Sequence, residues 1–433
     1  MNITTQKPEL MRTIGRWSLV ALMANSIIGA GIFGLPSLLA ARIAGYSPLS
    51  CIIAGGGALV IAACIAEIAS RFESTGGLYL YGRTALGCFA GLLIAWLLLL
   101  TRIAAPAAAA DLFASYLGQF LPGLNGKLME IGVIALLIGH LALLNYLGVA
   151  TGKTVSDIFT TIKVGMLVLF IATGLLALGL HPSLRLALHF GSPSATAWFE
   201  ALLLLVFGYG GFEGALIVAG ESRNPRRDMP FALLTALLLQ VFLYTAVVYV
   251  VLAALPDAGA SERPLADAAR HFLGGWGATA IGFGALVSTY GYLSANLLHS
   301  TRITFALSEQ GDFPKFFALV HPRYRTPYTS IVAYSLAVFV FAALGDFRWN
   351  AILSAATRLV VYGGMAIALM VLRKRSGPAP FALPSGLLFS TVALLIVFVL
   401  LTRIGPGEAT VLVLTAVIAL ANWLALRRVP APS

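Results

Sequence analysis

Two long hydrophobic segments of this chain are interrupted by clusters of glycine. The first cluster spans residues 29–34 within an apolar stretch of about 17–40, and the second spans 208–214 within about 195–220. Inside a lipid bilayer, a peptide group that leaves a helix has no water to bond with, so an unwound turn persists only where protein, trapped water or a ligand satisfies it. Two such breaks at corresponding places in two halves of a chain indicate a transporter binding site.

The composition requires a membrane environment. The 433 residues are 59% hydrophobic and 10% charged, whereas a water-soluble domain has about a quarter of its residues charged. We therefore predict an all-α integral membrane protein with about twelve transmembrane helices, each long enough to cross about 30 Å of hydrocarbon. The predicted spans are 17–41, 47–70, 84–120, 128–150, 154–180, 195–220, 230–255, 274–307, 328–345, 348–372, 382–403 and 408–427.

The distribution of Lys and Arg predicts the orientation of these spans. If the N-terminus is cytoplasmic, the inner junctions and both termini carry about seventeen cations and the outer junctions about seven, in agreement with the positive-inside rule. We therefore expect a multi-pass protein of the inner (plasma) membrane with both termini in the cytoplasm. The same distribution accounts for the net charge of +11, so we predict no nucleic-acid partner.

The sequence gives no indication of a metal site or a cofactor. Cys51, Cys64 and Cys88 fall in or beside membrane segments and lack metal-ligand spacing, so packing is a sufficient role for them. The stretch after the polar first sixteen residues is longer than a signal-peptide core, and we expect it to remain as the first span.

The spacing of the two broken spans predicts an internal repeat. Spans one and six are five spans apart, so spans one to five would match six to ten. Because five is odd, the second unit enters the membrane from the opposite side, and the repeats are inverted. The whole chain, 1–433, is then one transporter domain, with repeat one at 1–180, repeat two at 195–375, and two added helices at 382–427.

The breaks offer groups that suit an α-amino acid. A half-helix that begins presents unpaired N–H groups and the positive end of its dipole, and a half-helix that stops leaves free carbonyls. We expect the substrate carboxylate to meet the backbone at Ile28, Gly29, Ala30 and Gly31, and its ammonium to meet the carbonyls of Phe207 and Gly208. The alternative for these glycines is close helix packing.

Several motifs together resemble the amino acid–polyamine–organocation (APC) permeases. They are Gly-Ala-Gly-Ile-Phe at 29–33, the polar hinge at 71–79, Gly-Phe-Glu at 211–213 followed by the hinge at 220–230, and the segment 302–314. The resemblance runs in order over about residues 12 to 375. It implies a LeuT-like inverted-repeat fold and alternating-access transport of amino acids or related amines.

The resemblance also assigns roles by position. Gly29 to Gly31 match the carboxylate-binding turn, Phe207 matches an aromatic residue that closes over the substrate, and Glu213 matches an acidic residue that many members use for protons. Tyr209 stands at a position that varies in the family, so its role within the expected binding site is open. Arg358 and Tyr362, one helical turn apart in span ten, are expected along the inner pathway.

Lys163 lies about nine residues into span five, where a buried ammonium is costly without partners. On depth alone, an equal alternative is that the long side chain extends back to the cytoplasmic interface and keeps its charge in water. The resemblance implies instead that the ammonium replaces the sodium ion of sodium-coupled relatives and bridges the span-one break to span eight. Ser288, Ser294 and Asn296 are the candidates for the span-eight partner.

Arg102 is an unexpected charge within span three. Intramembrane arginines are functional by default. Facing the binding pocket, it would disfavour cationic substrates and pair with Glu213, Asp111 or an acidic substrate; facing a neighbouring helix, it needs only a structural partner. The alanine-rich stretch 104–110 that follows is expected to form a roomy pocket floor.

These observations predict a secondary active amino acid permease, with proton-coupled symport of a neutral amino acid as the first hypothesis and Glu213 and Lys163 as the titrating groups. The alternatives are an amino acid or polyamine antiporter and an amino acid sensor that does not transport. An intramembrane enzyme is disfavoured because the sequence contains no His-Glu-x-x-His zinc helix and its acidic residues within spans are scattered. The oligomeric state is left open.

Overall fold

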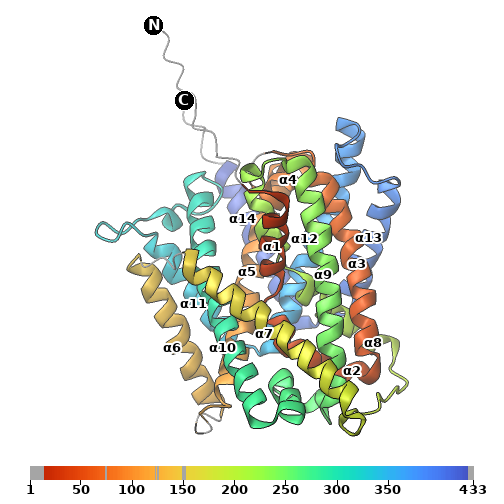
Figure 1. The fold of residues 1–433 in the computed structure, drawn as a ribbon. Coiled ribbons are helices and arrows are strands. Elements are labelled where there is room, and N and C mark those ends of the chain that lie inside the picture. Colours follow the sequence, from red (N-terminus) through yellow and green to blue (C-terminus); the bar gives the residue numbers. More distant parts are fainter. Residues whose placement is uncertain (1–13, 74–75, 122, 124–125, 149–152, 428–433) are drawn as a thin grey trace.

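The computed structural model describes residues 14–73, 76–121, 123, 126–148 and 153–427, and its regular elements there are all helices (Figure 1). The only extended pairing among these residues is an isolated bridge between Ile14 and Ser222. The terminal residues 1–13 and 428–433, on which the predicted orientation partly rests, lie outside the described residues.

The first span is broken where glycine was expected to break it. Helix α1 (Arg16–Ile27) ends, the chain turns through residues 28–30, and α2 (Gly31–Ile43) begins. The turn starts at Ile28, whose ψ of 85° leaves the helical region. Glycine on either side of Ala30 gives the turn little helical preference of its own.

The second break is sharper. Helix α8 (Ala195–Tyr209) ends at Gly210, which is extended, and the chain resumes as the 3₁₀ segment η4 (Phe212–Glu221). Gly211 between them has a φ of +116°, a conformation that residues with a Cβ rarely adopt. The glycine cluster thus permits a turn that other residues would oppose.

The two broken helices run in opposite directions. The amide of Ile14, before α1, donates to the carbonyl of Glu221 at the end of η4 (3.0 Å), and the amide of Arg223 donates to the carbonyl of Ile14 (3.0 Å). The start of one broken helix therefore meets the end of the other, as an inverted repeat requires. The full correspondence between 1–180 and 195–375 stays a prediction.

The remaining helices surround this pair. They are α3 (Ser47–Ala69), α4 (Gly77–Leu86), α5 (Cys88–Leu117), α6 (Lys127–Tyr146), α7 (Lys153–Leu180), α9 (Pro225–Ala254), α10 (Pro264–Glu309), α11 (Tyr328–Leu344), α12 (Phe347–Ser376), α13 (Gly386–Leu401) and α14 (Pro406–Arg427). Short 3₁₀ turns join some of them: η1 (Ala44–Tyr46), η3 (Pro182–Leu184), η5 (Ala258–Ala260) and η6 (Lys315–Ala318).

In the described parts of the chain, nine helical segments are long and apolar enough to span a membrane, and two shorter apolar helices, α11 and α13, accompany them. One of the nine joins α2 and α3 across η1. If α2 and α3 are counted separately and α11 and α13 are added, the total equals the twelve spans predicted from the sequence. That all twelve cross the membrane stays a prediction. Helix α10 is kinked at Gly274, so its first ten residues form a short helical segment distinct from the rest.

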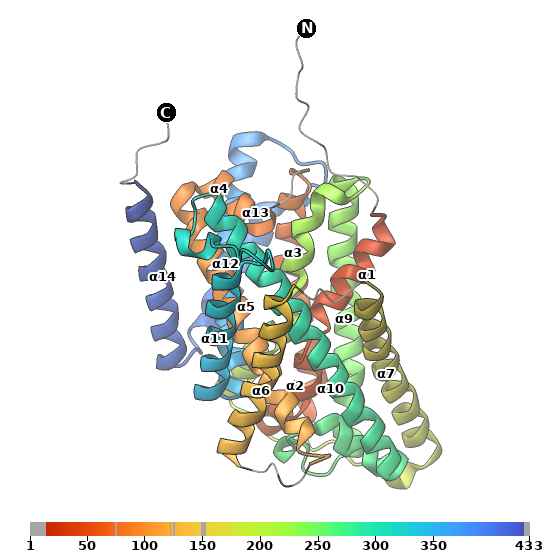
Figure 2. The ribbon, with the colours of Figure 1, turned by 90° about the vertical axis from the view of Figure 1, so that its left-hand side faces the viewer.

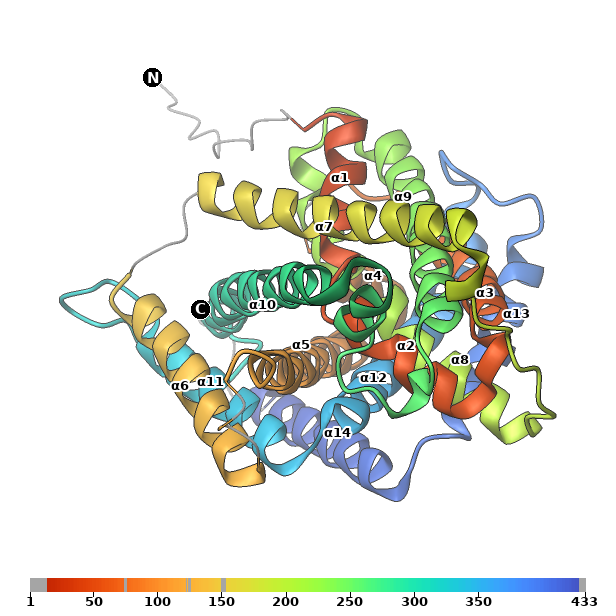
Figure 3. The same ribbon diagram turned by 60° about the horizontal axis from the view of Figure 1, so that its bottom comes forward.

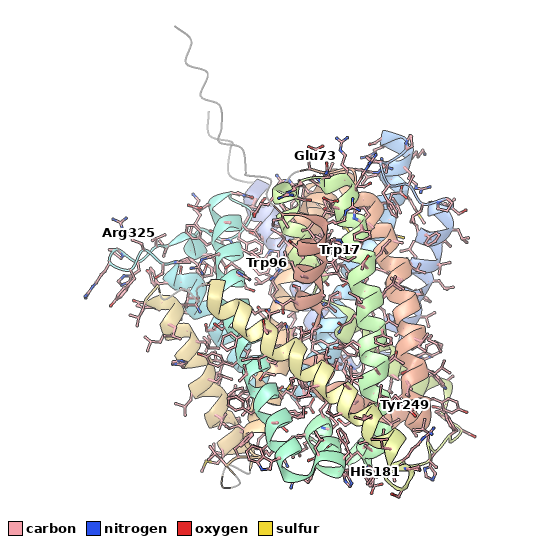
Figure 4. The ribbon with its side chains drawn as sticks, viewed as in Figure 1. Trp17, Glu73, Trp96, His181, Tyr249 and Arg325 are labelled. Carbon is pink, nitrogen blue, oxygen red and sulfur yellow. The ribbon has the colours of Figure 1, made fainter. Side chains whose placement is uncertain are left out.

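The helices differ in how deeply they lie in the bundle. In the most apolar window of α12, 72% of the residues are buried, whereas in that of α14 the share is 11%. Figures 2 and 3 show α5 and α10 near the centre, with α14 at the periphery. The charged hinges gather at one end of the bundle: Glu73 lies there, and His181 and Tyr249 lie at the opposite end (Figure 4).

Ion pairs join helix ends at the Glu73 end. Arg16 lies 3.5 Å from Asp228, and Arg226 lies 3.0 Å from Glu73. Glu67 is fully buried and accepts from Arg373 through both of its carboxylate oxygens (2.7 and 2.5 Å). The arginine-rich junctions predicted for the cytoplasmic side therefore do meet on one face of the molecule.

Candidate functional site

A cavity of about 90 Å³ lies between the two helix breaks, large enough for a few water molecules or a compact ligand. Six of the residues predicted to bind substrate line it together: Gly29, Ala30 and Gly31 from the first break, Phe207 and Gly208 from α8, and Arg102 from α5. The rest of its wall includes Ser26, Thr101, Gly210, Gly211, Glu213, Gly214, Tyr244, Tyr292, Asn296 and Arg358.

Close packing explains why glycine occupies key positions of this wall. A Cβ on Gly31 would lie 2.9 Å from the hydroxyl of Tyr244 and 3.2 Å from the ring of Phe207. A Cβ on Gly208 would lie 2.8 Å from Leu35. Glycine therefore brings α2, α8 and α9 together around the cavity while leaving the backbone within reach of a ligand.

Aromatic rings close the cavity at one end. The ring of Phe207 packs edge-on against that of Phe347, with centroids 6.1 Å apart, and Phe347 fits against Gly34. Beyond them, Glu200 pairs with Arg42 (2.9 Å) and Arg348 (3.6 Å) and ties α8 to α2 and α12. That Phe207 closes over a bound substrate remains a prediction, but its position suits the role.

Lys163 completes the end of α1. Its ammonium donates to the carbonyls of Ile28 (2.7 Å) and Asn25 (2.9 Å), and the residue is 6% exposed. The last carbonyls of a helix lack intrahelical partners, and here a buried cation supplies them. The lysine therefore reaches the span-one break from α7, as the family resemblance implied.

Ser288 and Ser294 share a cavity with Lys163. All three line a second cavity of about 480 Å³ between α1, α7, α10 and η4, and Asn296 lines this cavity too. The two serines are buried, at 4% and 6% exposure. Which α10 side chain completes the bridge from Lys163 stays a prediction.

Glu213 is held in an ion pair with Arg358. Its Oε1 accepts from Nε of Arg358 (3.0 Å) and from the hydroxyl of Tyr362, and its Oε2 accepts from the amide of Gly211 (2.6 Å). Both charged side chains are buried, at 6% and 5% exposure. The sequence singled out each of these groups but not their pairing, which two opposite charges at membrane depth could have suggested.

The position of Arg358 also explains why residue 210 is a glycine. A Cβ at that position would lie 2.2 Å from the arginine Nε, a separation that atoms do not tolerate. The arginine arm thus crosses the backbone of the second break to reach Glu213. The extended Gly210 is as much a part of this charge pair as the two side chains.

Arg102 lines both cavities. Its backbone carbonyl accepts from the hydroxyl of Tyr334, and the adjacent Thr101 donates to Thr357 (2.7 Å), so α5 is fixed on both sides of the arginine. Among the described residues, no carboxylate forms an ion pair with it; Glu213, one partner considered from the sequence, is paired elsewhere.

Three expectations need correction. Tyr209 does not line the central cavity: its hydroxyl donates to the carbonyl of Cys51 (2.7 Å), so it faces α3. Ile28 does not line the cavity either: its carbonyl accepts from Lys163 and its amide donates to the carbonyl of Ala24 (2.9 Å), so its backbone is already engaged. Of the alanine stretch 104–110, Ala105 reaches the cavity and the other described alanines are buried in helix contacts, so the pocket is tight rather than roomy.

Two aromatic residues of the wall had no assigned role from the sequence. Tyr244 of α9 places its hydroxyl beside Gly31, and the polar position within an apolar helix was its only sequence signal. Tyr292 of α10 lies over Gly29, with ring atoms 3.7–3.8 Å from where a Cβ would be, rather than at lipid. The glycines that alternate with it in α10 were consistent with either position.

Comparison with known proteins agrees with this architecture. The family model described as "Amino acid permease" matches residues 14–421. The branched-chain amino acid permease BcaP of Bacillus subtilis is 26% identical over 93% of this chain and 90% of its own length. The methylthioribose transporter of the same organism is 28% identical over 87% and 84%, respectively. The vacuolar cationic amino acid transporter 4 of Arabidopsis thaliana is 27% identical over 84% and 64%.

Proposed function

This chain belongs to the amino acid permease family, and on that premise we propose that it is a secondary active amino acid transporter of a bacterial-type inner membrane, with both termini cytoplasmic. The observation that carries the proposal is the cavity between the two unwound segments, because its wall combines backbone of both breaks. The amides at Gly29, Ala30 and Gly31 suit the substrate carboxylate, and the carbonyls near Phe207 and Gly208 suit its ammonium.

The two cavities support transport by alternating access. Phe207 and Phe347 close the central cavity on the outer side, whereas the second cavity adjoins it on the inner side and shares Ser26, Arg102 and Gly214 with it. We therefore assign the arrangement to an inward-facing state. In the opposite state, the α2–α8 side would open and the inner cavity would close.

We assign proton coupling to Lys163. While charged, its ammonium binds the carbonyls of Asn25 and Ile28 and so holds α1 to α7. Loss of the proton removes this charge-assisted contact and frees α1 to move, which links the proton on Lys163 to the movement of α1 between the two states. Glu213 is a weaker candidate for carrying the proton than the sequence suggested, because Arg358, Tyr362 and Gly211 already occupy its oxygens.

The names of the relatives do not select a substrate. One is named for branched-chain amino acids, one for methylthioribose and one for cationic amino acids. The neutral amino acid predicted from the sequence remains one candidate within the proposal. An exchanger without obligatory proton movement is the second mode, since the same site serves it.

The test is uptake of a panel of radiolabelled amino acids by proteoliposomes, with an inward proton gradient, with sodium, and with neither. We expect gradient-driven uptake that Lys163→Ala abolishes and that the exposed control Lys315→Ala leaves intact. Uptake only into preloaded liposomes would replace symport by exchange. Transport of no amino acid under any condition would contradict the proposed function.

A further inference from the structure

The charges along the inner pathway are strongly one-sided. Three cationic side chains, Arg102, Lys163 and Arg302, line the inner cavity beside His299, and the described wall contains no aspartate or glutamate. The central cavity adds Glu213 and Arg358, which neutralise each other across 3.0 Å. The described lining between the binding site and the inner face is therefore electropositive, and such a lining concentrates anions and repels cations.

Arg102 is the cation in this lining that remains without a fixed partner. Lys163 is engaged by two carbonyls and Arg358 by Glu213, whereas His299 and Arg302 are exposed. Arg102 is partly buried at membrane depth, and no described carboxylate pairs with it. Keeping an arginine there is costly unless a partner arrives during the transport cycle.

We propose that this partner is the substrate: an amino acid with a second negatively charged group, such as a side-chain carboxylate, which Arg102 binds through its guanidinium. This inference rests on the proposed function and names the substrate class of the same site. It favours acidic over neutral amino acids and disfavours cationic amino acids and polyamines.

The position of the guanidinium fits a second carboxylate. A Cβ on Gly214 would lie 3.7 Å from Nη2 of Arg102 and 3.5 Å from the hydroxyl of Ser26. The arginine therefore lies where the central and inner cavities meet, beyond the Gly29 to Gly31 amides that suit the α-carboxylate. A substrate held by those amides would extend its side chain toward Arg102.

The surrounding contacts hold Arg102 ready for this role. Tyr334 bonds its carbonyl, and Thr101 bonds Thr357, so its backbone is fixed from α11 and α12. Asn296, which also lines both cavities, lies 2.6 Å from the same Tyr334 hydroxyl and accepts from Ser300 (2.9 Å). A planar guanidinium on a fixed backbone can bind a carboxylate through two parallel hydrogen bonds, which a neutral side chain cannot reproduce.

The experiment compares pairs of amino acids that differ only in side-chain charge. Competition by glutamate, glutamine, aspartate, asparagine, leucine and lysine is measured against the best-transported radiolabelled amino acid in proteoliposomes. We expect glutamate or aspartate to compete at least about tenfold better than its amide, and lysine to compete least. Arg102→Gln should remove this preference for the acid, Arg102→Lys should retain part of it, and Arg270→Gln, at an exposed outer position, should leave it unchanged.

The outcomes separate this inference from the proposed function. If a neutral amino acid is transported and the acids compete no better than their amides, Arg102 is not a substrate ligand and the inference is wrong, while the transporter assignment stands. An acid preference that persists in Arg102→Gln would also overturn it. If Arg102→Gln fails to fold, the acid-to-amide comparison on the unmodified protein still decides.

Discussion

Nε of Arg358 lies 3.0 Å from Oε1 of Glu213, inside the membrane-spanning bundle and across the unwound turn of the second broken helix. The arginine belongs to α12 and the glutamate to η4, so one ion pair joins a continuous helix to a discontinuous one. Tyr362 and Gly211 complete the donors around the carboxylate. A buried pair of this kind fixes how η4 and α12 pack as much as it stabilises them, because each charge is tolerated only in the presence of the other.

Glu213→Gln should therefore destabilise the protein strongly, by about 3–5 kcal/mol, because it leaves the buried Arg358 without its counter-charge. The measurement is the unfolding free energy of the protein in detergent. The double variant Glu213→Gln/Arg358→Gln should lose much less than the sum of the two single variants. Glu309→Gln, at the exposed end of α10, serves as the control; additive losses in the double variant would argue against coupling.

Gly211→Ala should weaken the second break. The φ of +116° is strained for alanine, and its Cβ would lie 2.5 Å from the carbonyl oxygen of Ser26. We expect a loss of about 1–3 kcal/mol in thermal unfolding, together with reduced uptake. Gly132→Ala is the matched change in α6, where no atom lies within 4 Å, and it should be neutral or slightly stabilising. Equal effects of the two changes would contradict this account of the turn.

Asp312→Asn should loosen the junction between α4 and the turn after α10. The carboxylate accepts from the hydroxyl of Tyr79 (2.5 Å) and from Arg83 (3.0 Å). We expect the free energy of unfolding to fall by about 1 kcal/mol. This loss should be smaller in high salt, because the Arg83 side chain is 45% exposed and salt screens its charge. Asp257→Asn, on an exposed outer turn, is the control.

The same junction predicts a pH dependence. Burial, reinforced by the hydrogen bond to Asp312, raises the pKa of Tyr79 to about 12. Because the folded-state pKa lies above the ordinary value of about 10, the stability linked to this proton is fully present below pH 10 and is lost as the pH rises through 12. We therefore expect Tyr79→Phe to lower the free energy of unfolding at neutral pH and to flatten its decline between pH 10 and 12. A decline as steep as that of the unmodified protein would contradict this linkage.

Cys88 offers a test of orientation. It is exposed at the start of α5, whereas Cys51 and Cys64 are buried. With the arginine-rich face in the cytoplasm, a membrane-impermeant maleimide should label inside-out vesicles and not intact spheroplasts. Cys88→Ser should abolish the labelling; labelling of intact spheroplasts at Cys88 would reverse the predicted topology.

The sequence was most informative where local chemistry decides the structure. Glycine at 29, 31, 210 and 211 marks both helix breaks because little else favours unwinding in lipid. Lys163 was identifiable because a cation at membrane depth needs partners. The direction of Tyr209 was not predictable, since it is the last helical residue before a break and its orientation depends on where the helix stops. The pairing of Glu213 with Arg358 requires two helices 145 positions apart to pack together, which spacing cannot show.

The backbone bonds of Ile14 have a mechanical consequence. Through Glu221 and Arg223, these hydrogen bonds join the beginning of α1 to the chain that leaves η4. The inner halves of both broken helices are thereby coupled: α1 cannot swing outward alone without breaking the two peptide hydrogen bonds that join it to the end of η4. If Lys163 releases α1, the displacement of α1 would also displace η4 and, through the Glu213–Arg358 pair, α12. Loss of a proton on α7 would thereby change the position of a helix on the opposite side of the binding site.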